Sequence, residues 1–449
     1  MRPKQPAQPD GAEIPTTLLQ PGAARFWLAV LGAGICAGIG AAVLTKFLEL
    51  VQHLAWGGSG THILEAAAQA AAWRHIAVLL GAGAMIGLGQ FVLTRLSTGN
   101  GIDITAAIWF SAGRLPALRT LGSAVLSVVG VAMGASLGRE GAPKQAGAVF
   151  ANLISDRGGL SDEQRRLLVA CGAGAGMSAA YGVPLGGALF ALEVLRGMLA
   201  LRLVLPALIC SLVATVVSWI ALPDAPTYQI PSFPYSGTAL LLAGFIGPVA
   251  GLVSVAYVRA VAWAEHNRPV GWQRFVTPVV VLGILGVISV KYPQLVGNGS
   301  DACQLLFNGG IPAATLLLPL LVLKPAATVL CLRSGTPGGL FTPSLTLGAL
   351  LGGMLGYLGS LIWPDTSLGL PAVLGAGAVL AATTQGPISA VVLIMELTGR
   401  DRSFIAPVLL AVSLATLVSR TVEPRSIYDA RLSDKEIKER LAAREPSPH

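Results

Sequence analysis

The stretch CGAGAGMSAAYGVPLGGALFALEVLRG, residues 171–197, decides the fold because it returns later as LGAGAVLAATTQGPISAVVLIMELTGR, residues 374–400. The two stretches align without a gap, and each aligned pair lies 203 residues apart, so that Pro184 aligns with Pro387. A duplication of this kind predicts two related halves whose helices are interrupted at matching Gly and Pro positions.

The composition indicates that both halves lie in a membrane. Of 449 residues, 53% are hydrophobic and 12% are charged, whereas a soluble domain carries charge at about a quarter of its positions. Charge-free runs recur along the chain, among them residues 26–45, 302–323 and 366–395, and a helix crosses a bilayer in roughly 20 residues. The runs are continuous rather than alternating. They therefore predict an all-α polytopic membrane protein and not a β-barrel.

The same patterns divide the chain into four segments. These are a cytoplasmic N-terminal tail, two transmembrane repeats and a polar C-terminal segment that ends in a short amphipathic helix: residues 1–24, 25–223, 235–420 and 421–449. The first segment lacks the apolar core of a cleaved signal peptide. The 30 Lys and Arg against 22 Asp and Glu are typical of basic cytoplasmic loops. They favour cytoplasmic termini and give no reason to expect nucleic acid as a partner.

The reactive side chains carry no enzyme signature. The five cysteines are isolated, the five histidines include no HExxH pair, and no GxSxG is present. We therefore expect neither an enzyme nor a cofactor nor a metal site. An intramembrane enzyme is the alternative class of function, and it lacks a nucleophile, metal or phosphate constellation.

The interrupted helices predict a site for a small anion. In lipid, unpaired backbone N–H groups persist only where protein, water or a ligand satisfies them. At a helix N-terminus these groups carry about half a positive charge, and glycine lets an ion approach them. Paired breaks near Gly138 and Gly338 thus predict anion binding near the membrane midplane. The alternative is that glycine only lets helices pack closely.

Three motifs and one tyrosine resemble the CLC family of chloride channels and proton/chloride exchangers. GNGID at residues 99–103 resembles the family's GSGIP, GREGAP at 138–143 its GREGP, and SGTPGGLFTP at 334–343 its SGxPGGxFxP. Tyr428, in SIYDARL, stands where the family has its C-terminal pore tyrosine. The four features follow the family's order over nearly the whole chain.

The resemblance implies a CLC-type inverted repeat of about eighteen tilted, partly discontinuous helices. It also implies a homodimer with one pore per subunit. Since the sequence lacks the C-terminal regulatory domains of eukaryotic relatives, a multi-pass protein of a bacterial inner membrane is expected.

Glu140 is the predicted gate. GREGAP places an ionisable carboxylate among backbone amides inside a membrane, where such a group is costly and functional by default. The carboxylate can occupy the anion site when ionised and leave when protonated, and the family's gating glutamate implies the same role. The alternative is a structural ion pair with Arg139, which otherwise raises the local positive potential.

The resemblance implies further anion contacts. The amides of the first motif would face the central and inner sites, and those of GGLFTP the outer site. The Tyr428 hydroxyl would donate to a central anion, unless Tyr428 is an ordinary interfacial tyrosine. Lys324, alone in an apolar run, either snorkels or adds to the attracting field. Besides Glu140, the predicted anion-binding set is Gly99, Asn100, Gly101, Ile102, Arg139, Gly141, Leu340, Phe341 and Tyr428.

Several positions depart from the family's pattern. Asn100 replaces the serine of chloride-preferring members and the proline of some nitrate-preferring ones, so selectivity among chloride, nitrate and fluoride stays open. Asp103 replaces the motif's proline and is expected to cap a helix. Val194 lies ten residues after Pro184, where exchangers carry a proton-relaying glutamate. Glu193 is adjacent, but one residue turns a helical side chain by about 100 degrees, so a structural role is expected.

The sequence therefore predicts transport of small anions, with chloride first, through a pore gated by protonation of Glu140. Valine carries no proton, so uncoupled or weakly coupled transport is expected. The alternative is a proton-coupled antiporter of chloride or another anion. The expected partners are the anion, protons at the gate, membrane lipid and a second copy of the chain.

Overall fold

The computed structural model describes residues 14–15, 17–57, 63–96, 103–233, 237–310, 314–362, 368–399 and 404–442. The regular elements of this part of the chain are all helices. Its eighteen α-helices are joined by one π-helix and two 3-10 turns, and its only β-bridge is isolated. Seven of these helices, α1, α3, α9, α10, α13, α14 and α17, are long and apolar enough to cross a membrane.

The first half contains α1 to α9, with the π-helix η1 directly after α8. Their bounds are α1 Ala23–Trp56, α2 Ile63–Gln69, α3 Ala72–Leu96, α4 Ile104–Phe110, α5 Ala117–Ala132, α6 Gly141–Arg157, α7 Asp162–Tyr181, α8 Pro184–Phe190, η1 Ala191–Arg196 and α9 Leu201–Ser218. The second half contains α10 to α17. Their bounds are α10 Gly237–His266, α11 Gln273–Ser289, η2 Pro293–Leu295, α12 Ser300–Phe307, α13 Ala314–Arg333, α14 Phe341–Ser360, α15 Gly369–Thr384, α16 Pro387–Thr398 and α17 Ile405–Val422. The turn η3 (Asp429–Arg431) and α18 (Asp434–Ala442) follow.

Two charge-free runs are each split between two helices. The run 302–323 holds the end of α12 and the start of α13. The run 366–395 holds α15 and most of α16, which separate where Gln385 takes a left-handed φ of 58° and Pro387 starts the next helix. Proline lacks an N–H and suits the first turn of a helix, so an apolar run need not be one helix.

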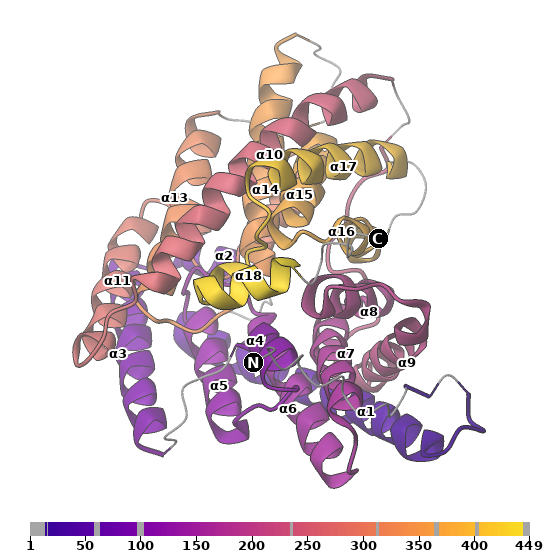
Figure 1. Cartoon of the computed structure of the whole chain (residues 1–449). Coiled ribbons are helices and arrows are strands. Elements are labelled where there is room, and N and C mark those ends of the chain that lie inside the picture. Colours follow the sequence, from indigo (N-terminus) through magenta and orange to yellow (C-terminus); the bar gives the residue numbers. More distant parts are fainter. Residues whose placement is uncertain are drawn as a thin grey trace, which may run out of the picture.

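The two halves meet along paired helices. Figure 1 shows α8 of the first half beside α16 of the second, and α3 beside α11. The duplicated stretches lie at the first of these contacts, because α8 and α16 follow their two matching prolines. The predicted duplication therefore brings the same segment of each half to the boundary.

Glu193 and Glu396 connect the halves reciprocally. The Glu193 carboxylate accepts a hydrogen bond of 2.6 Å from the Ser389 amide at the start of α16, and another from the preceding amide. The Glu396 carboxylate accepts one of 2.6 Å from the Gly186 amide at the start of α8, and again a second from the preceding amide. A carboxylate at a helix N-terminus offsets the positive end of the helix dipole. Glu193 thus has the structural role that the sequence predicts, and Glu396 has the same role in the other half.

Close glycine contacts hold the helices that carry the site. A Cβ on Gly147 of α6 would overlap the carbonyl of Gly172 on α7, and a Cβ on Gly348 of α14 would overlap that of Gly375 on α15. Small residues let helix backbones approach in this way. The same close packing in each half holds α6 against α7 and α14 against α15, and the candidate site lies at the starts of α6 and α14.

Candidate functional site

The segments before α6 and α14 pair with each other. The Gly138 amide donates to the Gly339 carbonyl at 2.8 Å, and the Gly339 amide donates to the Gly138 carbonyl at 2.8 Å. GREGAP and GGLFTP, far apart in sequence, therefore lie side by side at the starts of two helices.

The Glu140 carboxylate is buried in this junction. One oxygen accepts a hydrogen bond from the Phe341 amide at 2.6 Å, and the other accepts one from the Thr342 hydroxyl at 3.2 Å. A Cβ on either Gly138 or Gly339 would overlap the carboxylate, so a larger residue at either position would displace the carboxylate. A carboxylate that accepts hydrogen bonds from donors at a helix N-terminus occupies the position where a free anion would bind.

Arg139 lies with Tyr181 and not with the neighbouring carboxylate. Its guanidinium carbon stands 4.8 Å from the centre of the Tyr181 ring, and no ion pair in the described part of the chain joins it to Glu140. The structural ion pair that was the alternative for Glu140 is therefore not formed.

Tyr181 and Thr342 belong to the site, and the sequence did not single them out. The Tyr181 hydroxyl lies 2.8 Å from the Thr342 hydroxyl, and its ring centre lies 5.9 Å from that of Phe341. Tyr181 ends α7 in the first half, while Thr342 lies in the first turn of α14. Thr342 is part of the motif SGTPGGLFTP, so the sequence offered its hydroxyl as a candidate hydrogen-bond donor of the site. Tyr181 lies in the duplicated stretch, but its partner lies in the other half.

Tyr428 is buried rather than interfacial, and it contacts a buried lysine. The Lys144 ammonium donates to the Tyr428 hydroxyl at 3.3 Å and stands 4.6 Å from the centre of that ring. It also lies 5.2 Å from the centre of the Phe190 ring. Lys144 lies on α6 four residues after Glu140, and such residues share one face of a helix. The sequence analysis missed Lys144, although the sequence shows a charge one helical turn after the predicted gate, Glu140.

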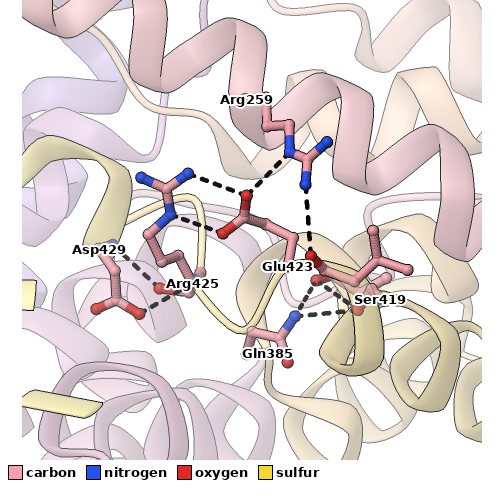
Figure 2. A network of polar contacts seen from close by, with 9 residues as sticks. Arg259, Gln385, Ser419, Glu423, Arg425 and Asp429 are labelled. Carbon is pink, nitrogen blue, oxygen red and sulfur yellow. Dashed lines mark hydrogen bonds and ion pairs between the residues drawn. The ribbon is translucent and has the colours of Figure 1, made fainter. Parts of the chain in front are cut away.

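A polar network fixes the segment that leads to Tyr428. Figure 2 shows the Glu423 carboxylate between Arg425, which donates at 2.6 and 2.9 Å, and Arg259, which donates at 3.1 Å. The Arg425 guanidinium holds the pKa of the Glu423 carboxyl below its ordinary value by hydrogen bonding to the ionised form. Asp429, next to Tyr428, accepts from the Ser426 amide at 2.9 Å.

The C-terminal helix α18 reaches Val194, the position where the sequence analysis expects no proton relay. Arg440 pairs with Asp429 at 2.5 Å, and both side chains are buried. The same guanidinium donates to the Val194 carbonyl at 2.7 Å and lies 5.1 Å from a ring centre of Trp109. Val194 itself is buried in η1. Val194 therefore contributes an apolar side chain, and its carbonyl already accepts a hydrogen bond from Arg440.

The remaining predicted residues have mixed positions. Gly99, Asn100, Gly101 and Ile102 lie outside the described residues. Leu340 is buried at the N-cap of α14, one residue before the amide that binds Glu140, and Gly141 begins α6 against Gly339, where a Cβ would lie 2.9 Å from the Gly339 nitrogen.

Two further side chains named from the sequence have defined partners. Asp103 caps α4 by accepting from the Thr105 amide at 2.8 Å, as predicted. Lys324 does not snorkel, because it is buried and donates to the carbonyls of Leu295 at 2.9 Å and Gly297 at 2.8 Å.

A family model described as voltage gated chloride channel matches residues 82–420. The chain belongs to this family. This CLC chain is 32% identical over 314 residues to the H(+)/Cl(-) exchange transporter ClcA of Vibrio cholerae serotype O1 (strain M66-2). That match covers 67% of the chain and 66% of the relative, so the chain spans about two thirds of the exchanger's length.

Other relatives are named as chloride channels. The chain is 32% identical over 332 residues to the voltage-gated ClC-type chloride channel ClcB of Escherichia coli O139:H28 (strain E24377A / ETEC), covering 70% of the chain and 76% of the relative. It is 29% identical over 427 residues to a putative chloride channel protein ClcB-like of Ralstonia nicotianae (strain ATCC BAA-1114 / GMI1000), covering 90% and 96%.

Solved structures confirm the fold. A slow cyanobacterial Cl-/H+ antiporter superposes with a TM-score of 0.79 at 21% identity, over 94% of this chain and 99% of that one. A CLC-type fluoride/proton antiporter superposes with a TM-score of 0.69 at 21% identity, over 91% and 98%. The predicted CLC-type architecture is therefore correct.

Proposed function

We propose that the protein transports small anions, chloride first, through a pathway that the ionised Glu140 carboxylate closes. The observation that carries the proposal is the pair of hydrogen bonds that this carboxylate accepts from the Phe341 amide and the Thr342 hydroxyl. Both donors are neutral and both belong to the first turn of a helix. Such donors bind a transported anion as readily as they bind a carboxylate.

Protonation of Glu140 opens the pathway in this proposal. The carboxylate is buried and has no ion-pair partner in the described part of the chain, so its charge depends on charge-assisted hydrogen bonds and the helix dipole. A proton removes the charge that holds the side chain in place. The site is then free for an anion, and flux rises as the pH falls.

Coupling of anion movement to protons is weak in this proposal. Val194 has no titratable group, and the adjacent Glu193 carboxylate is held by the start of α16. These two observations leave no glutamate at the inner relay position. Protons then reach the gate without a fixed ratio to the anions transported.

The second candidate function is proton-coupled antiport of chloride or another anion. One relative is an H(+)/Cl(-) exchange transporter by name, and two structural neighbours are named as proton antiporters, which favours it. It requires a proton route from the inner side that bypasses Val194. Fluoride and nitrate are alternative ions, because the described residues do not include the selectivity position Asn100.

We further propose that two copies assemble in a bacterial inner membrane, each with its own pathway and both termini in the cytoplasm. The four segments 1–24, 25–223, 235–420 and 421–449 belong to this proposal. The exposed apolar faces of the spanning helices support burial in lipid.

Purified protein in liposomes tests the two functions together. Chloride release is measured with an electrode, and the reversal potential is measured under a chloride gradient with and without a pH gradient. We expect chloride release that accelerates on acidification and a reversal potential that ignores the pH gradient. A steady shift with pH would establish antiport instead. Monodisperse protein that releases neither chloride, nitrate nor fluoride would overturn anion transport.

A further inference from the structure

Lys144 is a buried cation that the gate does not use. Only 5% of the residue is exposed, and within the described residues no carboxylate lies at ion-pair distance from its ammonium. Its one side-chain hydrogen bond is the weak contact of 3.3 Å to the Tyr428 hydroxyl. An ammonium has three N–H donors, and a buried charge without a counter-charge is strongly unfavourable.

Lys324 shows what a protein-satisfied buried lysine looks like in the same chain. It is 2% exposed and donates at 2.9 and 2.8 Å to two backbone carbonyls. Those carbonyls belong to the turn before α12, so the side chain fixes backbone. Lys144 is buried to a similar degree but contacts one hydroxyl and two aromatic rings. Its remaining donors are thus available to a ligand.

The position of Lys144 defines what that ligand is. The side chain lies one helical turn after Glu140 and contacts Tyr428, so it links the predicted gate to the predicted pore tyrosine. The Phe190 and Tyr428 rings, whose centres are 5.7 Å apart, flank the ammonium. Aromatic faces stabilise a cation only modestly. The missing partner is therefore a small anion.

We infer that Lys144 is a specificity-determining anion ligand, whose ammonium binds the anion together with the Tyr428 hydroxyl and favours small anions of high charge density. This inference rests on the proposed anion transport. An ammonium is a compact point charge, and its attraction for an anion grows as the ions approach. Chloride or fluoride gains more from it than thiocyanate or iodide, which are larger. Neutral amides and hydroxyls attract an anion less strongly than an ammonium, so a site built from them alone would prefer small anions less.

The wild-type protein provides the first test. Isothermal titration calorimetry of detergent-purified protein measures the Kd for chloride and for thiocyanate, and liposome flux shows whether the same sample transports anions. We expect tighter binding of chloride. Tighter binding of thiocyanate by a protein that transports chloride overturns the role of Lys144 and leaves the proposed function intact. A protein that neither transports nor binds an anion overturns the proposed function itself.

Substitution of Lys144 provides the second test. Because hydrogen bonds to charged groups contribute enough for about tenfold in affinity, Lys144→Met is expected to weaken chloride binding about tenfold and thiocyanate binding less. Lys144→Arg keeps the charge and is expected to restore the preference for chloride. An unchanged ratio of the two Kd values in Lys144→Met overturns the inference.

A third variant separates ligand binding from mere positioning of Tyr428. Tyr428→Phe removes the hydroxyl that Lys144 contacts but keeps the ring and the lysine. If Lys144 only positions the tyrosine, Tyr428→Phe reproduces the full loss of chloride preference, and the inference fails. If Lys144 binds the anion, Tyr428→Phe keeps most of that preference. Each variant is compared with the wild type by thermal melting, and Lys144→Gln serves where Lys144→Met does not fold.

Discussion

The starts of α6 and α14 have the same backbone plan and different chemistry. Both helices carry proline two residues after their first residue, Pro143 in one and Pro343 in the other. Each helix is also preceded by one of the two glycines, Gly138 and Gly339, that form the β-bridge. The α6 side supplies the charges of Glu140 and Lys144. The α14 side supplies neutral donors, and Ser344, which takes the place of Lys144, turns its hydroxyl back to a carbonyl of its own helix.

The pair α8 and α16 shows the opposite relation. There both halves use the same residue for the same purpose, because Glu193 and Glu396 each bind the start of the other half's helix. Positions where the halves agree thus make up the framework. Positions where they differ make up the proposed gate, in which the α14 side would bind the anion through neutral donors and the Glu140 carboxylate of the α6 side would compete with it.

The largest effect is expected from removing the charge that distinguishes the two halves. Glu140→Gln keeps the size of the side chain but loses the ionised oxygens that bind the Phe341 amide and the Thr342 hydroxyl. Anion flux at neutral pH should rise by about tenfold to a hundredfold, since charge-assisted hydrogen bonds of this kind contribute about 1.5–3 kcal/mol. The acid activation of flux should disappear. Liposome flux across a pH series measures both effects, and an unchanged pH profile would remove Glu140 from the gate.

A smaller effect is expected from crowding the carboxylate without removing it. A Cβ at position 339 would overlap the Glu140 carboxylate, so Gly339→Ala should displace it from the Phe341 amide. Flux at neutral pH should rise by about threefold, less than in Glu140→Gln, because the displaced charge still competes for the site. Gly244→Ala, where a Cβ meets nothing within 4 Å, is the matched control. Equal flux in the two alanine variants would contradict the prediction that Gly339 leaves room for the Glu140 carboxylate at the Phe341 amide.

Much of this comparison was available from the sequence. The paired breaks near Gly138 and Gly338 located both helix starts. The family resemblance named Glu140 and Phe341, which a hydrogen bond joins, and Tyr428, which contacts Lys144. Hydropathy alone did not show the break between α15 and α16, but the duplication did, because it predicted interruptions at matching prolines and Pro387 starts α16 as Pro184 starts α8. The left-handed Gln385 before it was not predicted.

Contacts across the halves were not predictable. Which face of α6 turns toward Tyr428 depends on how α6 packs, so Lys144 was visible as a charge but not as a partner. Tyr181 was missed for the same reason, since its contact with Thr342 joins the end of α7 to the start of α14.

The symmetric framework predicts equal effects in the two halves. Glu193→Gln and Glu396→Gln should each lower stability by about 1 kcal/mol, because each removes a carboxylate from the start of a helix. Thermal melting of both variants in one detergent measures the losses. Neither variant should change the ratio of chloride to thiocyanate affinity. A large loss in one variant only would show that the two contacts are not equivalent, and a changed affinity ratio would place that glutamate in the pathway.

The smallest effect concerns the network that fixes Tyr428 after the second half. Arg425 lowers the pKa of Glu423, so this carboxylate stabilises the fold at pH values above the ordinary glutamate pKa of about 4.3, and the contribution is lost as the pH falls through the lowered value. Glu423→Gln should therefore melt at a lower temperature than the wild type at neutral pH, and the difference should shrink on acidification. Glu49→Gln, which removes a surface pair with Lys46 at 2.9 Å, should have a smaller effect. A difference for Glu423→Gln that stays constant down to strongly acidic pH would mean that its hydrogen bonds, rather than its charge, hold the segment of Tyr428 in place.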